Sequence, residues 1–135
     1  MIEKCVMIIN ADLPLGLIAN TAAVLSLTIG SKVEEIIGPD IYDGSGGKHT
    51  GITTTPIPIL KSDADEIKRL REEAANLDHL FVVDFSDAAQ STKTYDEYTQ
   101  KISATPSPKL NYLGIAIYGK KKSVNKLTGS MPLLR

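Results

Sequence analysis

Few side chains in this sequence could do acid–base chemistry, and most of them follow apolar runs of strand length. Asn10 and Asp12 come after the first apolar run, and Asp84, Ser86 and Asp87 come at the end of a later one. Polar groups just past the carboxyl ends of buried strands are where α/β proteins tend to build their sites. A carboxylate at that position, Asp12 or Asp87, is the candidate general base.

Four further residues are candidates for ligand binding around the same strand ends. Gly16 lies at an expected helix start, where backbone N–H groups are free, and Asn20 and Thr21 interrupt an otherwise apolar helix. Thr53 opens an expected edge strand. We predict that these residues converge with Asn10 on one pocket. A simpler interpretation stays open for several of them, because Asn, Asp and Thr side chains often bond to nearby backbone.

Most other kinds of chemistry lack the residues they need. The chain has two histidines, His49 and His79, and a single cysteine, Cys5, whereas a zinc site needs several such ligands at short spacing. No Gly-x-Ser-x-Gly elbow, dinucleotide fingerprint or P-loop is present. The basic run 120–122 is interpreted as a solvated turn or, as the alternative, a phosphate-contacting patch. We therefore expect no metal and no cofactor.

Length and charge narrow the class of protein. The chain has 135 residues, of which 42% are hydrophobic, a net charge of −1 and an isoelectric point near 6.1. This length favours one domain over residues 1–135 with an ordinary core. A near-neutral chain has no general field for phosphates, and the lone Cys5 is typical of a reducing compartment. We expect a cytoplasmic protein.

The stretch from Leu13 to Ser31 is uncharged and reaches the length of a membrane-spanning helix. It contains Pro14, Asn20 and other polar or helix-breaking residues. That content favours a helix packed inside a protein, against a sheet and against a second layer, so no membrane span is expected.

Hydrophobic periodicity and turn residues predict alternating strands and helices. Glu66, placed after Ser62 and Asp63, gives a capping-box signal for the clearest helix. The expected elements are a strand at 3–10, a helix at 16–29 with Gly30 as its C-cap, a hairpin or ordered excursion at 32–52, an edge strand at 53–60, a helix at 62–76, a strand at 79–84, a short helix at 94–102 and a strand at 110–118. This order indicates an α/β fold with a mixed sheet between helices.

Several segments resemble the type II peptidyl-tRNA hydrolases. Residues 4–13 are similar to that family's first strand, which ends in Asp-Leu, and Gly16-Leu17 starts a small-residue helix like the one that follows it. Asp87-Ala88 resembles the family's Asp-Ala-Gly loop, and residues 124–129 resemble its closing Asp-Lys-Val-Thr-Gly. The resemblance implies a three-layer α/β/α fold with a mixed, mostly parallel sheet and, because related folds make dimers, a homodimer.

The chain departs from these hydrolases where their chemistry is expected. Leu17 stands in place of a lysine, and Thr21, Ala23 and Val24 stand where a glutamine and a Ser-His pair belong. Peptidyl-tRNA hydrolysis needs cationic and hydrogen-bonding groups, which Leu and Val cannot supply. The chain therefore resembles an uncharacterised bacterial family, a domain of unknown function that shares the hydrolase fold. The matching motifs are the Asp-Leu-Pro-x-Gly opening, Gly51-Ile52-Thr53 and Pro56-x-Pro58-x-Leu60.

Three functions follow as alternatives. We favour a protein that binds a small molecule or peptide in a pocket at the strand ends. The second alternative is a hydrolase of peptidyl-tRNA or another ester or amide, with Asp12 or Asp87 as general base and tRNA as its partner. The third is a dimeric interaction or scaffold protein.

Overall fold

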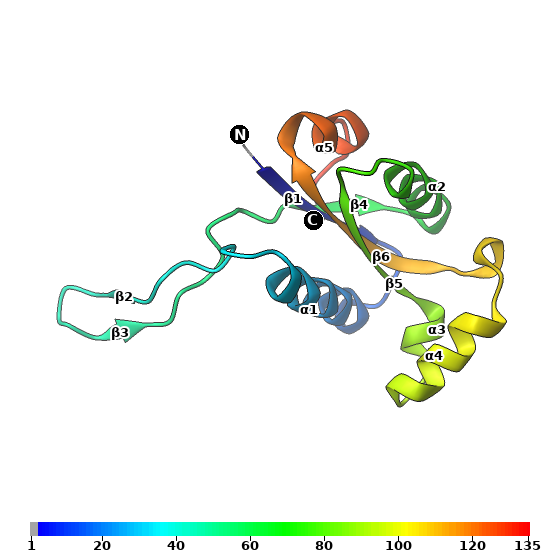
Figure 1. Ribbon diagram of the computed structural model, residues 1–135, viewed down its shortest axis with the longest axis horizontal. Coiled ribbons are helices and arrows are strands. Elements are labelled where there is room, and N and C mark those ends of the chain that lie inside the picture. The colour runs from blue at the N-terminus through cyan, green and yellow to red at the C-terminus, as the bar shows by residue number, and fades with distance from the viewer. Residues whose placement is uncertain (1–2) are drawn as a thin grey trace.

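The protein is built on a four-stranded mixed sheet. The structure, a computed structural model, describes residues 3–135. The strands are β1 (Glu3–Asn10), β4 (Ile59–Ser62), β5 (Phe81–Ser86) and β6 (Tyr112–Lys120). Their order is β4-β1-β6-β5 (Figure 1), and β1 runs parallel to β4 but antiparallel to β6, which is also antiparallel to β5. The mixed sheet between helices is confirmed.

The expectation of a mostly parallel sheet is wrong, because two of the three pairings are antiparallel. The reason lies in the connection from β5 to β6. Ser86 at the end of β5 pairs with Tyr112 at the start of β6, so the chain leaves and re-enters the sheet at the same end of the strands. A parallel pair would need a crossover connection that returns the chain to the opposite end of the strands.

Strand β1 lies in the middle of the sheet and forms the centre of the core. Its residues 5–9 are fully buried, and Met7 pairs with Ile59 on one side and Ala116 on the other. Alternate side chains enter different apolar clusters on the two faces, with Met7 on one and Ile8 on the other. The apolar run at 3–10 is confirmed as a central strand.

One face of the sheet is covered by the long helix α1 (Leu15–Lys32). Three of its side chains are buried against the strands: Thr21, Leu25 and Ile29. The helix is longer than expected, and Gly30 lies inside it instead of capping it, since the C-cap is Val33. By length and composition α1 could cross a membrane, the one helix of residues 3–135 that passes this test, and part of it is buried on the sheet.

The other face is covered by α2 (Ala64–Ala75) and α5 (Lys121–Thr128). The predicted cap of α2 is confirmed, because the Asp63 carboxylate accepts the Glu66 N–H at 2.9 Å and the Ser62 hydroxyl donates to Glu66 Oε1 at 2.6 Å. Helix α5 was not predicted. Its lysine-rich first turn resembles a solvated tail, and only Val124 and Thr128 are buried.

A group of short helices lies beyond β5 at one end of the sheet (Figure 1). It comprises α3 (Asp87–Gln90), α4 (Tyr95–Ala104) and the 3-10 turn η1 (Ser107–Lys109). The short helix expected at 94–102 is confirmed as α4, whose N-cap Thr94 accepts the Glu97 N–H at 3.1 Å. This group forms the connection between β5 and β6.

A two-stranded arm projects away from the body between α1 and β4 (Figure 1). Its strands are β2 (Ile41–Tyr42) and β3 (Lys48–His49), which pair only with each other. The tip turns at Gly46, whose φ of 82° lies in the left-handed region that glycine tolerates. The hairpin expected within residues 32–52 is confirmed.

Strand β4 is shorter than the strand predicted at 53–60. Pro56 and Pro58 lack backbone N–H groups, and pairing starts only at Ile59. The expected edge position is confirmed. The outer edge of β4 is covered by the C-terminal segment, where Lys61 N–H donates to Pro132 O and Leu134 N–H to Ile59 O, both at 2.9 Å.

Candidate functional site

Asn10, the last residue of β1, and Asp87, the residue that follows β5, lie at the same end of the sheet. Ile9 pairs with Gly114, which in turn pairs with Phe85, so β1 and β5 end at the same level. Strand β6 lies between them, which separates the two chain segments by about 10 Å. The structure therefore brings the predicted residues after β1 and β5 to one end of the sheet but not into one cluster.

The polar groups at the end of β1 are engaged locally. The Asn10 Oδ1 atom accepts the backbone N–H of Asp12 at 2.9 Å, and the Asp12 side chain is exposed. This is an Asx-type turn, which shapes the chain between β1 and α1. It matches the simpler of the two interpretations of these residues, while a catalytic role for Asp12 stays a prediction.

Asp87 connects the start of α3 to the start of β6. Its carboxylate accepts from Asn111 N–H at 3.4 Å and from Asn111 Nδ2 at 3.3 Å, and its own N–H donates to Asn111 O at 2.9 Å. These bonds close the loop that carries α3, α4 and η1. A role for Asp87 as general base also stays a prediction.

The other predicted binding residues are dispersed. Thr21 is fully buried and donates its hydroxyl to Leu17 O at 2.7 Å, whereas Asn20 and Gly16 are exposed in α1. The Thr53 hydroxyl forms a turn with the backbone of Thr55, donating at 2.8 Å and accepting at 3.1 Å.

Thr53 also lies toward the opposite end of the sheet from Asn10. Its neighbour Thr55 lines a hollow together with Glu3 and Lys4, at the start of β1, whereas Asn10 ends that strand. The length of β1 corresponds to about 26 Å. The expectation that all these residues converge on one pocket is therefore wrong, because Thr53 precedes β4, which runs parallel to β1, whereas Asn10 ends β1.

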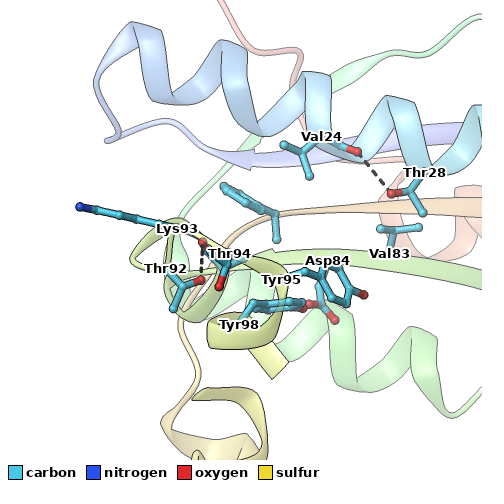
Figure 2. Close-up of a pocket in the computed structure, with 11 residues that line it drawn as sticks. Val24, Thr28, Val83, Asp84, Thr92, Lys93, Thr94, Tyr95 and Tyr98 are labelled. Carbon is cyan, nitrogen blue, oxygen red and sulfur yellow. Dashed lines mark hydrogen bonds between the residues drawn. The ribbon is translucent and has the colours of Figure 1, made fainter. Parts of the chain in front are cut away.

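A cavity of about 420 Å³ lies beside β5, between α1 and the segment that leads into α4 (Figure 2). Val24 and Thr28 of α1 line one side, and Tyr95 and Tyr98 of α4 lie on the other. The volume falls in the range of ligand sites, which are mostly apolar with a few polar groups. The pattern of strand-end residues gave no signal for it, because its walls come from segments far apart in the sequence.

The cavity reaches around the outer edge of β5. Its lining includes the consecutive residues Val83, Asp84 and Phe85. Successive side chains of a strand point to opposite faces, so a cavity that touches all three must pass along the strand's edge. Asp84 and Ser86 belong to β5, which corrects the expectation that they lie in a loop after the strand.

This edge of β5 is open. Strand β5 pairs with β6 on one side, and within residues 3–135 no strand pairs with its other side. The opposite edge of the sheet differs, because the C-terminal segment covers β4. Alternate N–H and C=O groups of an unpaired edge strand point outward and are free to bond with another chain.

Two tyrosines and a carboxylate form the polar wall of the cavity. The rings of Tyr95 and Tyr98 meet edge to face, with centroids 5.5 Å apart, and Asp84 lies beside them (Figure 2). Burial raises the pKa of Tyr98, and the negative charge of Asp84 raises it further. The Tyr98 phenol carries its proton at neutral pH and can donate a hydrogen bond into the cavity.

Asp84 is also paired with a cation from the other side of the sheet. The Nη2 atom of Arg71, on α2, lies 3.4 Å from Asp84 Oδ2. The guanidinium carbon of Arg71 is 5.6 Å from the centre of the Tyr112 ring. The pKa of Tyr112 is raised, mainly by burial, and the positive charge of Arg71 opposes part of this rise. The carboxylate at the cavity wall is therefore compensated in charge by Arg71, and the other charged residue of the lining is Lys93.

Ser86 is a polar residue for which the folded structure offers no partner. Its side chain is completely buried, and its Oγ atom has no hydrogen-bond partner among the described residues. A buried hydroxyl without a partner carries a free-energy cost. The sequence placed Ser86 with the other strand-end residues but not inside the core.

A second cavity, of about 520 Å³, lies between the end of α2 and α5. His79 and Ser123 both line it, and His79 Nε2 lies 2.9 Å from Ser123 Oγ. That distance is within the range of a nucleophile and its base. The pair joins residues 44 positions apart, and no sequence motif announces it.

The thiol and the acidic groups of the described chain form no metal centre. Within residues 3–135 no cluster of three or more His, Cys, Asp or Glu side chains could hold an ion. Cys5 is buried, and burial raises the pKa of its thiol to about 11. A thiol of this kind is unreactive as a nucleophile at neutral pH.

Comparison with known proteins places the chain in a family. The family described as "Protein of unknown function (DUF2000)" matches residues 3–135. The chain belongs to this family. A solved structure, that of the protein of unknown function Atu0240 from Agrobacterium tumefaciens strain C58, is similar over 98% of each chain, with a TM-score of 0.88 and 22% sequence identity. No curated protein matches the sequence.

These findings confirm the expectation of an uncharacterised family and of an α/β fold. The DUF2000 family and the Atu0240 structure are both described only as of unknown function, so neither supports a relationship to the peptidyl-tRNA hydrolases. At 22% identity the structural match concerns the fold alone.

Proposed function

We propose that the protein binds a short extended polypeptide, which adds to the sheet as a strand alongside β5 and places one side chain in the adjoining cavity. The observation that carries this proposal is the coincidence of the open β5 edge with the 420 Å³ cavity. In strand addition, main-chain bonds to the edge give affinity and a side-chain pocket gives specificity.

The lining of the cavity favours one class of side chain. Val24, Val83 and Phe85 offer apolar contact, Tyr98 offers a hydroxyl group near the Asp84 carboxylate, and Thr28 offers a hydroxyl group on the α1 side. An aromatic side chain with a polar end, such as that of tyrosine, fits this combination. Aromatic pairs prefer the edge-to-face contacts that the Tyr95 and Tyr98 rings already make with each other.

The test starts from a displayed library of random peptides selected on the full chain. We expect enrichment of sequences with one aromatic residue in an extended context. The selected peptide, added to the protein, should slow hydrogen exchange at the outward amides of β5. Tyr95→Ala should weaken its binding about tenfold, as truncation of an interface aromatic does. Gln100→Ala, an exposed position on the same helix that does not line the cavity, is the matched control.

Two results would overturn the peptide proposal. One is a selection that enriches nothing above an unloaded support. The other is an enriched peptide that protects amides elsewhere in the chain and binds equally to the Tyr95→Ala and Gln100→Ala variants.

A hydrolase is the second candidate, and the His79–Ser123 pair in the 520 Å³ cavity supports it. A fluorophosphonate probe labels serines that a neighbouring base activates. Labelling of the wild type that is lost in Ser123→Ala and in His79→Gln would favour this candidate. Labelling in none of the three proteins would argue against Ser123 as a nucleophile. The hydrolase candidate would then depend on Asp12 or Asp87 as the general base.

A further inference from the structure

Helix α1 presents an uncharged face to the outside. Leu15, Ala19, Ala23 and Leu27 follow one another at intervals of four residues, so they share one face of the helix. All four are exposed, Leu15 to 81% and Leu27 to 79%, while the buried residues lie on the opposite side. The sequence predicted a second layer over this helix, and residues 3–135 supply none there. This face is called the α1 outer face below.

The arm is the second exposed apolar feature. The side chains of residues 39–50 are all exposed, and Ile41 and Tyr42 are exposed to 63% and 67%. At its base Ile37 and Ile52 are exposed as well. An isolated two-stranded hairpin is at best marginally stable in water. An arm of this kind needs a surface to lie on.

The arm and the α1 outer face are matched in length and direction. Helix α1 runs toward the base of the arm, and the arm continues beyond it, away from the body (Figure 1). An 18-residue helix is about 27 Å long, and a hairpin from residue 40 to its tip spans about 20 Å. The arm therefore points away from its own α1, and it is long enough to cover most of that helix in another molecule.

We infer that a second copy of this chain covers the α1 outer face, with the arm of each copy lying along α1 of the other. A twofold axis near the base of the arms makes the two contacts equivalent and closes the assembly. The small side chains of Ala19 and Ala23 let a strand or a second helix approach closely.

The available area agrees with a stable dimer. Ile41 and Tyr42 are consecutive in β2 and point to opposite faces of the arm, so one of them faces the partner's helix. With Ile41 in that place, five large apolar side chains expose on the order of 700 Å² per chain, taking roughly 200 Å² for a fully exposed side chain of this size. Specific interfaces bury about 800 Å² per partner. Those side chains are Leu15, Leu27, Ile37, Ile41 and Ile52.

The composition of α1 favours a protein partner over a lipid surface. Helices that lie in a membrane interface carry lysine and arginine along their polar face. The only basic residue of α1 is Lys32, at its last position. The arm, moreover, carries the acidic residues Asp40 and Asp43, which an anionic membrane would repel.

Sedimentation of the full chain over a concentration series tests this inference. We expect a dimer in the wild type. Leu27→Glu on α1 and Ile41→Glu on the arm should each raise the dissociation constant at least about tenfold, since each buries a charge in an apolar contact. Leu133→Glu, at an exposed apolar residue outside both surfaces, is the matched control and should leave it unchanged. Circular dichroism verifies that each variant is folded.

Reciprocal contact has a second test that does not depend on destabilising variants. An Ile41→Cys chain and a Leu27→Cys chain, mixed under mild oxidation, should form a disulfide-linked pair, because the one natural cysteine is buried. Two results would overturn the inference. One is a monomeric wild type, and its co-sedimentation with vesicles of anionic phospholipid would point to a lipid surface instead. The other is a dimer that both glutamate variants leave intact.

Discussion

Gly114, near the start of β6, lies directly beneath the buried Thr21 side chain of α1. A Cβ atom at position 114 would come within 2.8 Å of Thr21 Cγ2, 3.1 Å of Ile8 O and 3.3 Å of Ile9 Cγ1. The absence of a side chain at this position lets α1 approach the sheet closely, and this approach fixes the helix that forms one side of the cavity.

The first prediction concerns that contact. Gly114→Ala should lower the free energy of unfolding by about 1–3 kcal/mol, because the added methyl group overpacks the interface between helix and sheet. Urea denaturation measures the change. Thr21→Ser in the same background removes the Cγ2 methyl and should recover part of the loss. Gly16→Ala is the control, since nothing lies within 4 Å of its Cβ position, and it should not destabilise the protein. A neutral Gly114→Ala would contradict the close approach.

The second prediction concerns the tip of the arm. The Asp43 carboxylate accepts from Ser45 N–H at 2.9 Å and Gly47 N–H at 3.0 Å, and it lies 2.8 Å from His49 Nε2. The His49 contact and these two N–H groups lower the pKa of Asp43. An NMR titration should find the Asp43 pKa below its usual range and higher in His49→Ala. The carboxylate's contribution to the turn is present at neutral pH and is lost as the pH falls through that lowered pKa. Identical titrations in both proteins would contradict the contact.

The third prediction concerns Cys5. Burial raises the pKa of its thiol from 9.0 to about 11, which lowers the thiolate fraction at pH 8 about a hundredfold. A thiol reagent should therefore label the native protein far more slowly than the urea-unfolded chain. Fast labelling of the native protein would show that Cys5 is accessible.

The raised pKa of Cys5 also affects stability at high pH. Between pH 9 and 11 the unfolded chain releases the thiol proton that the native state retains, so the unfolded state binds fewer protons. Stability should fall as the pH rises through this window. Denaturation curves of Cys5→Ala should show a shallower fall in stability, because this variant lacks the thiol. Some fall should remain, because tyrosines with raised pKa values, such as Tyr98 and Tyr112, are still present. An equal slope in the two proteins would contradict this assignment.

The fourth prediction concerns catalysis at the strand ends. We expect no hydrolysis of an N-blocked aminoacyl-tRNA by the wild type, because Leu17 stands where the hydrolases carry a cation. Leu17→Lys, Asp87→Asn and Asp12→Asn are measured beside it. Turnover that Asp87→Asn or Asp12→Asn abolishes, with the fold intact by circular dichroism, would favour the hydrolase over the peptide-binding proposal. Turnover in Leu17→Lys alone would indicate a remnant of a hydrolase site.

Features with local causes could be predicted from the sequence. The apolar run of β1 and the Asp63 cap of α2 depend on neighbouring residues, and both are as expected. The arm followed from its glycine-rich tip. Helix α5 did not, because only two of its side chains enter the core and its lysines hide the helical period.

The sequence by itself determined that this is an α/β protein with a central β1, an uncharged α1 and polar residues at its strand ends. Only the tertiary structure decided that β6 enters between β1 and β5, that Thr21 is buried, and that Val24, Asp84 and Tyr95 border one cavity. The physical reason is that periodicity and capping report on contacts a few residues apart. The order of strands and the walls of a cavity depend on contacts between distant segments, for which the local pattern holds no signal.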